Sequence, residues 1–392
     1  MSGSPAGPLA GVKVLDFATV GPAARASRIL ADYGAEVVKL GAVPRAGGVQ
    51  IVPPYYAYSG NRGAERMLLD LKHPEGKAAF LDLAADADVV IESFRPGVVS
   101  RLGIDVDAVA EVNPGIVYCS TSGFGQTGPR SQWAGHDVNY LAVGGFLHCN
   151  GRRADGGPPL PGATVADIAA GGMQAAMAIM AALLGRDSEL PTPNHLDVSI
   201  ADGVVAMMGL YVDEYLATGT EPGPGHYILT GKYACYDIYE CSDGGWLSVG
   251  AIEGHFFAKL CELLGLEQHA AHQMDDDQQD QMRSDFAAAF ATRPRDEWVA
   301  ELGPADCCVA PVLDIAEVVI DEHFAARGLV ADATHETEGA FRQLGRIWAG
   351  TPSTEGPEQI RQATATDTVA LLAAAGYDSE RLNRLVEEGV VA

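Results

Sequence analysis

The chain has 392 residues, more than one domain usually contains, so the length favours two domains. Its 26 basic and 52 acidic residues give a formal net charge of -26, which argues against a nucleic-acid backbone or an anionic membrane surface as the main partner. The seven cysteines form no Cys-x-x-Cys pair and the N-terminus lacks a signal-peptide pattern, so we expect a cytoplasmic protein without a zinc site or a disulfide framework.

Short β-rich runs alternate with helical patterns over the first 120 residues. Strands are predicted at 12–17, 36–40, 89–91 and 116–120, and helices at 23–33 and 74–87. This alternation is typical of βαβ units and predicts an α/β domain with a parallel, Rossmann-like sheet. Because open α/β sheets bind ligands at the carboxyl ends of their strands, candidate contacts lie in the loops after Phe17, Leu40, Ile91 and Ser122.

A glycine-rich loop and a histidine follow the last of these strands. Residues 123–128 match the G-x-G-x-x-G dinucleotide pattern, but the chain continues as loop from Pro129 instead of entering a helix, so we expect a loop that encloses substrate. His136 lies between this loop and a predicted helix, where a ligand can reach a titratable group that is held in place. From these residues alone, a reactive histidine and a simple capping or loop histidine remain equally open.

An apolar stretch at 169–184 predicts a buried helix, because it is apolar on all faces and too short to span a bilayer. Asp167 stands immediately before this stretch, where the free amides of a helix N-terminus stabilise a carboxylate. The capping preference alone favours a simple N-cap aspartate over a reactive one.

The second half of the chain has the pattern of a surface link, a long helix and a smaller α+β unit. Prolines and polar residues predict the link at 187–194, and a helix is expected at 198–217. A hairpin is predicted from 233–241 and 246–250, followed by helices at 254–266, 278–291, 295–302 and 314–325. We therefore expect a large α/β domain at 1–198 and 331–392, a linker helix and linker at 199–228, and a small α+β domain with a return linker at 229–330.

Ordered motifs along essentially the whole chain resemble those of the class III CoA-transferase superfamily (CaiB/BaiF type), and within it the α-methylacyl-CoA racemase branch. The matching segments are 14–16, 30–39, 69–72, 91–98, 123–129, 135–140, 165–167, 251–253, 308–312 and 321–328. The Gly-His-Asp motif at 135–137 is typical of the racemase branch.

The resemblance implies an acid/base pair. Inverting a carbon next to a thioester carbonyl requires removing its proton from one face and returning one on the other, so two acid/base groups must flank that carbon. His136 and Asp167 match the two groups of the racemase branch, and Glu253 matches a glutamate that orients the histidine. Glycine-rich backbone at 170–172 is expected to donate amides to the enolate oxygen. The transferase branch uses the aspartate at the position of Asp167 to form an acyl anhydride, so movement of CoA to a carboxylic acid remains the alternative.

An acyl-CoA thioester is the partner that the resemblance implies, with no metal and no cofactor beyond the CoA of the substrate. The phosphates and the adenine of CoA would meet the basic loop residues Lys39, Lys72, Arg95 and Arg101, although a surface salt bridge is an equally good interpretation of each one singly. By resemblance, Asp137 and Tyr140 would face the pantetheine arm and the thioester, and Gly125 belongs to the loop expected to enclose substrate. Gly41 and residues 42–45 depart from the family pattern, so the resemblance does not determine which residues contact the adenine.

The family fold also implies an interlocked homodimer, in which linkers thread one subunit through the other. Each site would then combine the large domain of one chain with the small domain of its partner, and Glu253 would act across the two chains. The motifs do not determine the acyl group of the substrate, since a branched fatty acyl chain and a steroid side chain are both compatible with them.

Overall fold

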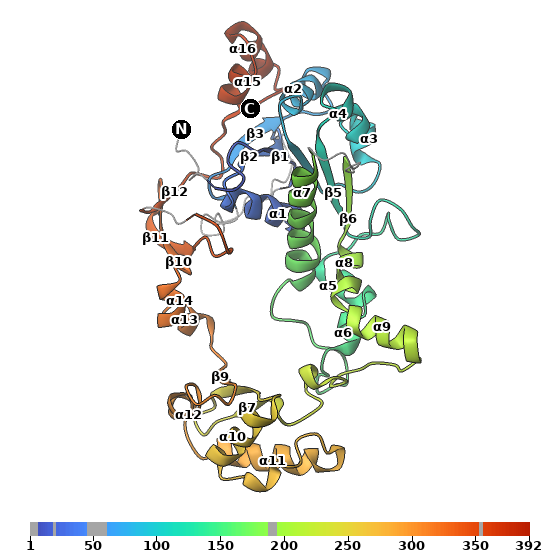
Figure 1. Cartoon of the computed structure of the whole chain (residues 1–392). Coiled ribbons are helices and arrows are strands. Elements are labelled where there is room, and N and C mark those ends of the chain that lie inside the picture. Colours follow the sequence, from blue (N-terminus) through green and yellow to red (C-terminus); the bar gives the residue numbers. More distant parts are fainter. Residues whose placement is uncertain (1–6, 19–20, 45–60, 187–193, 353–355) are drawn as a thin grey trace. The chain divides into compact units, whose positions relative to one another are not determined.

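The computed structural model describes residues 7–18, 21–44, 61–186, 194–352 and 356–392. The chain forms two compact units (Figure 1): unit 1 is Met1–Gly145, Pro161–Leu210 and Glu322–Ala392, and unit 2 is Phe146–Leu160 and Tyr211–Asp321. These boundaries differ from the expected ones in that 146–160 joins the smaller unit, 199–210 joins the larger one, and the chain returns at 322 instead of 331. The expected link at 187–194 lies, except for Asn194, outside the described residues.

A six-stranded parallel sheet forms the centre of unit 1, so the predicted α/β class is confirmed. Its order is β3-β2-β1-β4-β5-β6, and every neighbouring pair is parallel. The strands are β1 (Lys13–Asp16), β2 (Glu36–Ala42), β3 (Glu65–Leu69), β4 (Val89–Glu92), β5 (Val117–Ser122) and β6 (His195–Ser199). The two edge strands β3 and β6 were not predicted; β6 alternates polar with apolar residues directly after a proline-rich segment.

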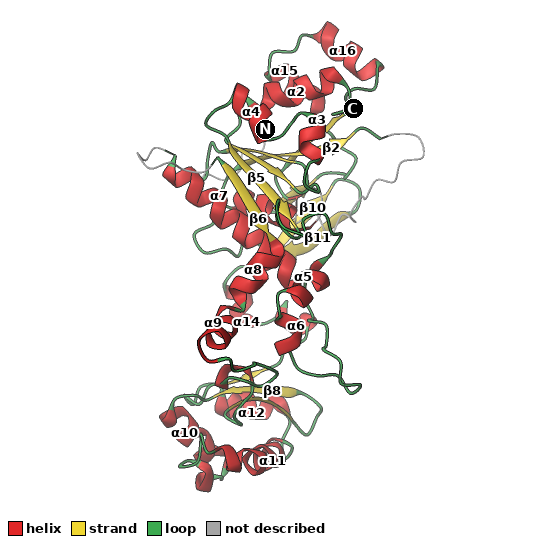
Figure 2. Cartoon of the chain, turned by 90° about the vertical axis from the view of Figure 1, so that its right-hand side faces the viewer, coloured by secondary structure: helices red, strands yellow, loops and turns green. Residues whose placement is uncertain are grey.

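Helices cover both faces of this sheet, as expected for a doubly wound fold. One face packs against α1 (Gly21–Asp32) and α7 (Gln174–Gly185), and Figure 2 shows α7 beside β5 and β6. The other face packs against α2 (Pro74–Ala84), α3 (Val98–Leu102), α4 (Val106–Val112), α15 (Thr368–Ala374) and α16 (Ser379–Glu387). Successive strand residues point to opposite faces, so Val14 belongs to the first core and Leu15 to the second.

The apolar helix of unit 1 differs from its prediction in two ways. It begins as the π-helix η2 (Ala166–Met173) and continues into α7, so Asp167 lies inside the helix and is not its N-cap. The continuous helix Ala166–Gly185 has 20 residues, which is long and apolar enough to cross a membrane by length and composition, contrary to the expectation that it is too short. In unit 1 this helix packs against α1, α8 (Ile200–Met207), β5 and β6.

The rest of unit 1 comprises shorter elements. The long helix expected at 198–217 is broken at Met208 into α8 and α9 (Gly209–Thr218), and α9 after its second residue belongs to unit 2. A three-stranded sheet of order β11-β10-β12 was not predicted; its strands are β10 (Val330–His335), β11 (Gly339–Leu344) and β12 (Glu358–Ile360). The remaining helices at the unit boundaries are α5 (Asp137–Val143), α6 (Phe146–Cys149) and α14 (Glu322–Ala326).

Unit 2 has the predicted α+β composition. The predicted hairpin is present as β7 (Tyr236–Glu240) and β8 (Trp246–Gly250), and β9 (Val309–Pro311) adds an antiparallel third strand. The predicted helices are α10 (Gly254–Leu264), α11 (Gln279–Phe290) and α12 (Arg295–Leu302), and together with the sheet they bury one apolar core. Short 3-10 turns occupy Ile228–Thr230, Glu267–His269 and Asp276–Gln278. The helix expected at 314–325 is divided into α13 (Ile315–Val318) and α14.

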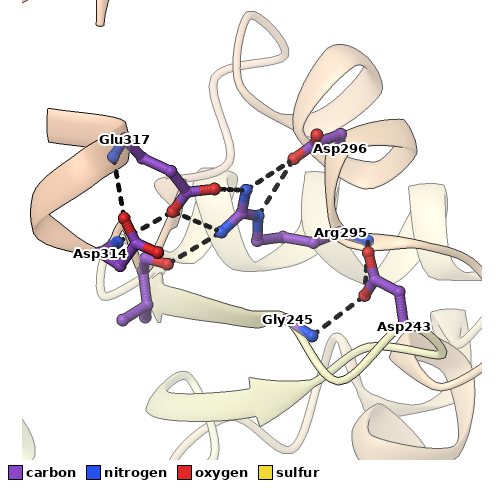
Figure 3. A network of polar contacts seen from close by, with 7 residues as sticks. Asp243, Gly245, Arg295, Asp296, Asp314 and Glu317 are labelled. Atoms are coloured by element: carbon purple, nitrogen blue, oxygen red, sulfur yellow. Dashed lines mark hydrogen bonds and ion pairs between the residues drawn. The ribbon is translucent and has the colours of Figure 1, made fainter. Parts of the chain in front are cut away.

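One arginine links the strands of unit 2 to α13 (Figure 3). The Arg295 side chain donates to both carboxylate oxygens of Glu317, to the Asp296 carboxylate at 3.0 Å and to the Val312 carbonyl at 3.1 Å. Asp243 accepts from the backbone amides of Arg295 and Gly245. A guanidinium presents its donors in a planar fork, so the Arg295 side chain joins α12, the segment after β9 and α13. The backbone amide of Arg295 makes the contact with the turn at Asp243.

Candidate active site

The sheet of unit 1 reverses its direction of growth between β1 and β4, because β2 and β3 extend it on one side and β5 and β6 on the other. Open α/β sheets bind ligands in the crevice outside the carboxyl ends of their strands at this position. The segment after β1 enters α1 at Gly21, and the segment after β4 carries Phe94 and Arg95. We therefore place the candidate site at the carboxyl edge of the sheet.

His136 is the N-cap residue of α5, so the interpretation of this histidine as a cap is confirmed for its backbone. Its backbone is extended (φ -130°) and lies outside the helix. Its amide donates to the Asn139 side-chain oxygen at 3.0 Å, and the Asn139 amide donates to the His136 carbonyl at 2.8 Å. The side chain is exposed and takes no part in this capping. The backbone of His136 is thus fixed while its imidazole stays accessible.

Tyr140 holds the backbone that precedes His136. It is buried, and its hydroxyl donates to the Gly135 carbonyl at 2.6 Å. A Cβ added at Gly123 would lie 2.5 Å from the Tyr140 ring and one at Gly135 would lie 2.7 Å from it, so both glycines are required for this close approach. The Tyr140 hydroxyl is thus used inside the loop, and a contact between Tyr140 and the thioester stays a prediction.

Asp137 and Asp167 are linked across 30 residues of sequence. The Asp167 amide donates to the Asp137 Oδ1 at 2.9 Å, which joins the first turn of α5 to η2. One oxygen of the Asp137 carboxylate thus accepts from the backbone of Asp167, and the expected contact of Asp137 with the pantetheine arm stays a prediction. Because α5 begins directly after His136, the contact between Asp137 and Asp167 brings His136 and Asp167 into one site.

The Asp167 carboxyl is half-buried, and burial raises its pKa above the ordinary value. The negative charge of Asp137 raises the pKa further, whereas the positive charges of Arg25 and His136 oppose the shift. His136 and Asp167 therefore interact electrostatically within unit 1, and the environment of Asp167 favours its protonated form more than water does.

Arg25 is the site residue that sequence reasoning missed. It lies in the first part of α1, and its Nη2 donates to the Thr164 hydroxyl at 2.9 Å, directly before η2. Nothing in its local sequence marks it, because it falls among alanines and small residues of an amphipathic helix. Its position at the carboxyl end of β1, where ligands bind in this fold, was the available signal.

The backbone at 170–172 does not serve as the expected anion donor. These residues are buried inside η2, where their amides belong to the helix. A Cβ at Gly171 would lie 2.5 Å from the Pro22 Cβ, and one at Gly172 would lie 2.8 Å from the Arg25 Cβ. The glycines therefore allow η2 to pack closely against α1.

Of the four basic residues predicted to contact CoA, Lys39 is not available at the surface. It lies within β2 and is buried, and its Nζ donates to the Asp16 carboxylate at 2.5 Å and to the Ser27 hydroxyl at 2.6 Å. A lysine in a buried strand needs such a partner, since an unpaired buried charge is costly. Lys39 therefore joins β1, β2 and α1 and is not a loop residue.

The other three basic residues are exposed. Lys72 lies in the turn after β3 and Arg95 in the turn after β4, both at the carboxyl edge of the sheet, whereas Arg101 lies inside α3 and not in a loop. Their contacts with CoA stay a prediction. Arg45, in the loop that departs from the family pattern, lies outside the described residues.

Gly125 shapes the loop after β5. It adopts a positive φ of 79°, and a Cβ there would lie 3.3 Å from the Ser199 Cβ. The next residue, Gln126, donates its amide to both carboxylate oxygens of Asp197, at 3.1 and 3.0 Å. The loop is thus tied to β6, and a contact between Gly125 and substrate stays a prediction.

Glu253 belongs to unit 2, so its relation to His136 stays a prediction. It is the N-cap residue of α10, where its carbonyl accepts from the Phe257 amide at 3.0 Å. Gln273 supports the preceding loop by donating to the carbonyls of Ala251 and Ile252, at 3.0 and 2.7 Å. The Cys308 thiol lies near this glutamate: burial and the negative charge of Glu253 raise the pKa of Cys308.

Comparison with known proteins identifies the family of this site. The sequence profile described as CoA-transferase family III matches residues 9–362, nearly the whole chain. The chain belongs to CoA-transferase family III.

Relatives of this family member include both racemases and CoA-transferases. The α-methylacyl-CoA racemase of Homo sapiens is 34% identical over 82% of this chain and 81% of the relative, and the Mus musculus racemase is 32% identical over 98% and 97%. The succinyl-CoA:glutarate CoA-transferase of Mus musculus is 30% identical over 85% and 78%. The family is therefore established, while racemases and transferases both stand among its similar members.

Solved structures support the same fold. The crystal structure of Rv3272 from M. tuberculosis covers 92% of this family III chain and 98% of its own, with a TM-score of 0.76 and 25% identity. A CaiB/BaiF family protein from Brucella suis covers 94% and 100%, with a TM-score of 0.72 and 26% identity.

Proposed function

We propose that this family III member is a racemase or epimerase that interconverts the (R)- and (S)-forms of 2-methylacyl-CoA thioesters through an enolate. The observation that carries the proposal is the pairing of His136 and Asp167 in unit 1, joined by the bond from the Asp167 amide to Asp137. The similarity to two racemases supports this choice.

The two groups suit proton transfer in opposite directions. The exposed imidazole of His136 removes the α-proton when neutral, and Asp167, whose pKa is raised by burial, donates a proton to the opposite face. The roles exchange for the opposite enantiomer. In an interlocked homodimer, the Glu253 of a partner chain orients His136.

The second candidate function is transfer of CoA from a thioester to a carboxylic acid, with Asp167 as the nucleophile. In that reaction the Asp167 carboxylate attacks the thioester carbonyl, which forms an acyl anhydride and releases the CoA thiolate. The thiolate attacks the Asp167 carbonyl of this anhydride, which gives an Asp167–CoA thioester and the free donor acid. The acceptor carboxylate displaces CoA to form a second anhydride, and the thiolate attacks its acceptor carbonyl, which yields the acceptor thioester and regenerates Asp167. The positive charge of Arg25 favours this function, since it stabilises the ionised carboxylate that a nucleophile requires. The transferase relatives support it as well.

The deciding measurement is exchange of the α-proton of a 2-methylacyl-CoA in deuterium oxide. We expect exchange with the unaltered protein and a loss of about 100-fold or more in the variants His136→Ala and Asp167→Asn, because general acid–base groups typically contribute that much. His148→Ala, which removes another exposed histidine, is the control. Exchange that persists in His136→Ala contradicts the racemase mechanism. Acceptor-dependent CoA exchange, together with an acyl-Asp167 that hydroxylamine cleaves, supports the transferase instead.

A further inference from the structure

Arg25 occupies a fixed position beside the candidate acid. Its helix starts at the carboxyl end of β1, and its Cβ lies so close to η2 that a Cβ at Gly172 would be 2.8 Å away. Its Nη2 is held by the Thr164 hydroxyl at 2.9 Å. The stem and one end of the guanidinium are thus both anchored, and Asp167 lies within its electrostatic reach.

Most of the hydrogen-bonding capacity of Arg25 is unused. A guanidinium has five N–H donors, and the bond to Thr164 is the single one that Arg25 makes among the residues the structure describes. It forms no direct ion pair with Asp167 within the described part of the chain, although the two charges interact. The side chain is partly buried, and its interaction with the Asp167 charge places these donors near the candidate acid.

The chemistry of the acyl chain decides whether binding beside the Arg25 donors is favourable. A hydrocarbon chain at the candidate site covers guanidinium donors without satisfying them, which is costly. A carboxylate satisfies them by bidentate, charge-assisted hydrogen bonds. A second negative charge is otherwise repelled by Asp137 and Asp167 in a chain of net charge -26.

We infer that Arg25 is a specificity-determining residue that binds a carboxylate on the acyl chain and selects short dicarboxylic 2-methylacyl-CoA thioesters over hydrocarbon ones. This inference rests on the proposed function for the position of the reacting carbon. A purely structural Arg25, which only holds Thr164 or balances Asp167, predicts instead that affinity is independent of the charge of the acyl chain.

Two thioesters that differ in one group provide the test. In 2-methylsuccinyl-CoA, with the thioester next to the methyl-bearing carbon, a carboxylate replaces the terminal methyl group of 2-methylbutanoyl-CoA. Their Kd and their kcat/KM for α-proton exchange are measured with the unaltered protein, Arg25→Gln and Arg25→Lys. Arg342→Gln is the matched control, because it removes one exposed positive charge from β11 in the same unit.

We expect the unaltered protein and Arg342→Gln to prefer 2-methylsuccinyl-CoA by about 10- to 100-fold in both quantities, the range for hydrogen bonds to charged groups. Arg25→Gln abolishes the preference, and Arg25→Lys, which keeps the charge without the fork, retains part of it. Equal affinities in the unaltered protein, or a preference that Arg25→Gln leaves intact, overturn the inference. If neither thioester exchanges while the Arg25-dependent preference in Kd remains, the racemase proposal fails and the carboxylate site stands. Thermal unfolding of each variant identifies misfolding, and a misfolded Arg25→Gln leaves the decision to Arg25→Lys.

Discussion

At the scale of single residues, the site depends on how neighbouring charges set the proton affinity of Asp167. Burial is the largest cause of its raised pKa, and the Asp137 charge acts in the same direction while Arg25 acts against it. Burial and the nearby Asp137 charge therefore raise the pKa of Asp167, so that its environment favours the protonated form more than water does.

The variant Asp137→Asn tests this balance. Asparagine keeps an oxygen that accepts from the Asp167 amide but removes the charge, so the pKa of Asp167 falls. In the direction in which Asp167 donates its proton, the rate is high below that pKa, so the decline of activity with rising pH moves to lower pH. The pH profile of α-proton exchange from the matching enantiomer measures this shift. Asp155→Asn, which removes the charge of an exposed aspartate in unit 2, is the control, and an unmoved profile in Asp137→Asn contradicts the assignment.

At the scale of elements, the close packing of α1, η2 and α8 positions the site. Gly171 is buried where the three helices meet, and a Cβ there would lie 2.5 Å from the Pro22 Cβ and 3.2 Å from the Ile200 Cγ1. The contacts of η2 with both α1 and α8 hold Asp167 opposite Arg25. Asp167 lies in a π-helix. Such helices are rare overall, and those that occur are often found at functional sites.

The substitution Gly171→Ala is expected to destabilise the chain by about 1–3 kcal/mol, because overpacking forces the helices apart. Chemical denaturation monitored by circular dichroism measures the loss. Gly209→Ala is the matched control, since Gly209 begins the helix α9, and a Cβ there meets no atom within 4 Å among the described residues. Equal stability of the two variants contradicts a close α1–η2 contact.

At the scale of the whole molecule, the chain leaves the large unit after α5, returns, leaves again within α9 and returns at 322. Such repeated crossing is consistent with the proposed interlocked homodimer. The acid/base pair lies in unit 1 and Glu253 in unit 2, so the proposed site requires both units. The source of Glu253, in the same chain or in a partner, therefore decides how the enzyme assembles.

Co-expression of His136→Ala and Glu253→Ala chains distinguishes the two sources. If Glu253 acts across chains, the mixed dimer contains one site with intact His136 and intact Glu253, so it regains about half of the unaltered activity per dimer if the two sites act independently. If Glu253 acts within its own chain, every site carries one defect. Purification on two different affinity tags isolates the mixed dimer, and α-proton exchange measures its activity. Light scattering that shows an active monomer rules out the dimer.

Local sequence determined those helices and strands that depend on residues close to one another in the chain. The hairpin of unit 2 and its three main helices depend on side chains within a few positions of one another and were predicted close to their observed bounds. The same holds for the strands and helices of the first 120 residues, except for β3, α3 and α4, which were not predicted. The positions of His136 and Asp167 also followed from the sequence, through motifs shared with a family. The α/β class and the family could therefore be predicted without the structure.

Tertiary structure alone decided what these side chains meet. Lys39 falls within a strand predicted from the sequence, but its burial against Asp16, 23 residues away, was set by the packing of β2 beside β1. The contact of Asp137 with Asp167, the enclosure of Tyr140 by two glycines, and the position of Arg25 beside η2 all join residues distant in sequence. Charge and hydrogen bonding act over a few ångströms in space, so the partners of a polar residue are set by packing, whereas its tendency to form a helix or a strand is set by its neighbours in the chain.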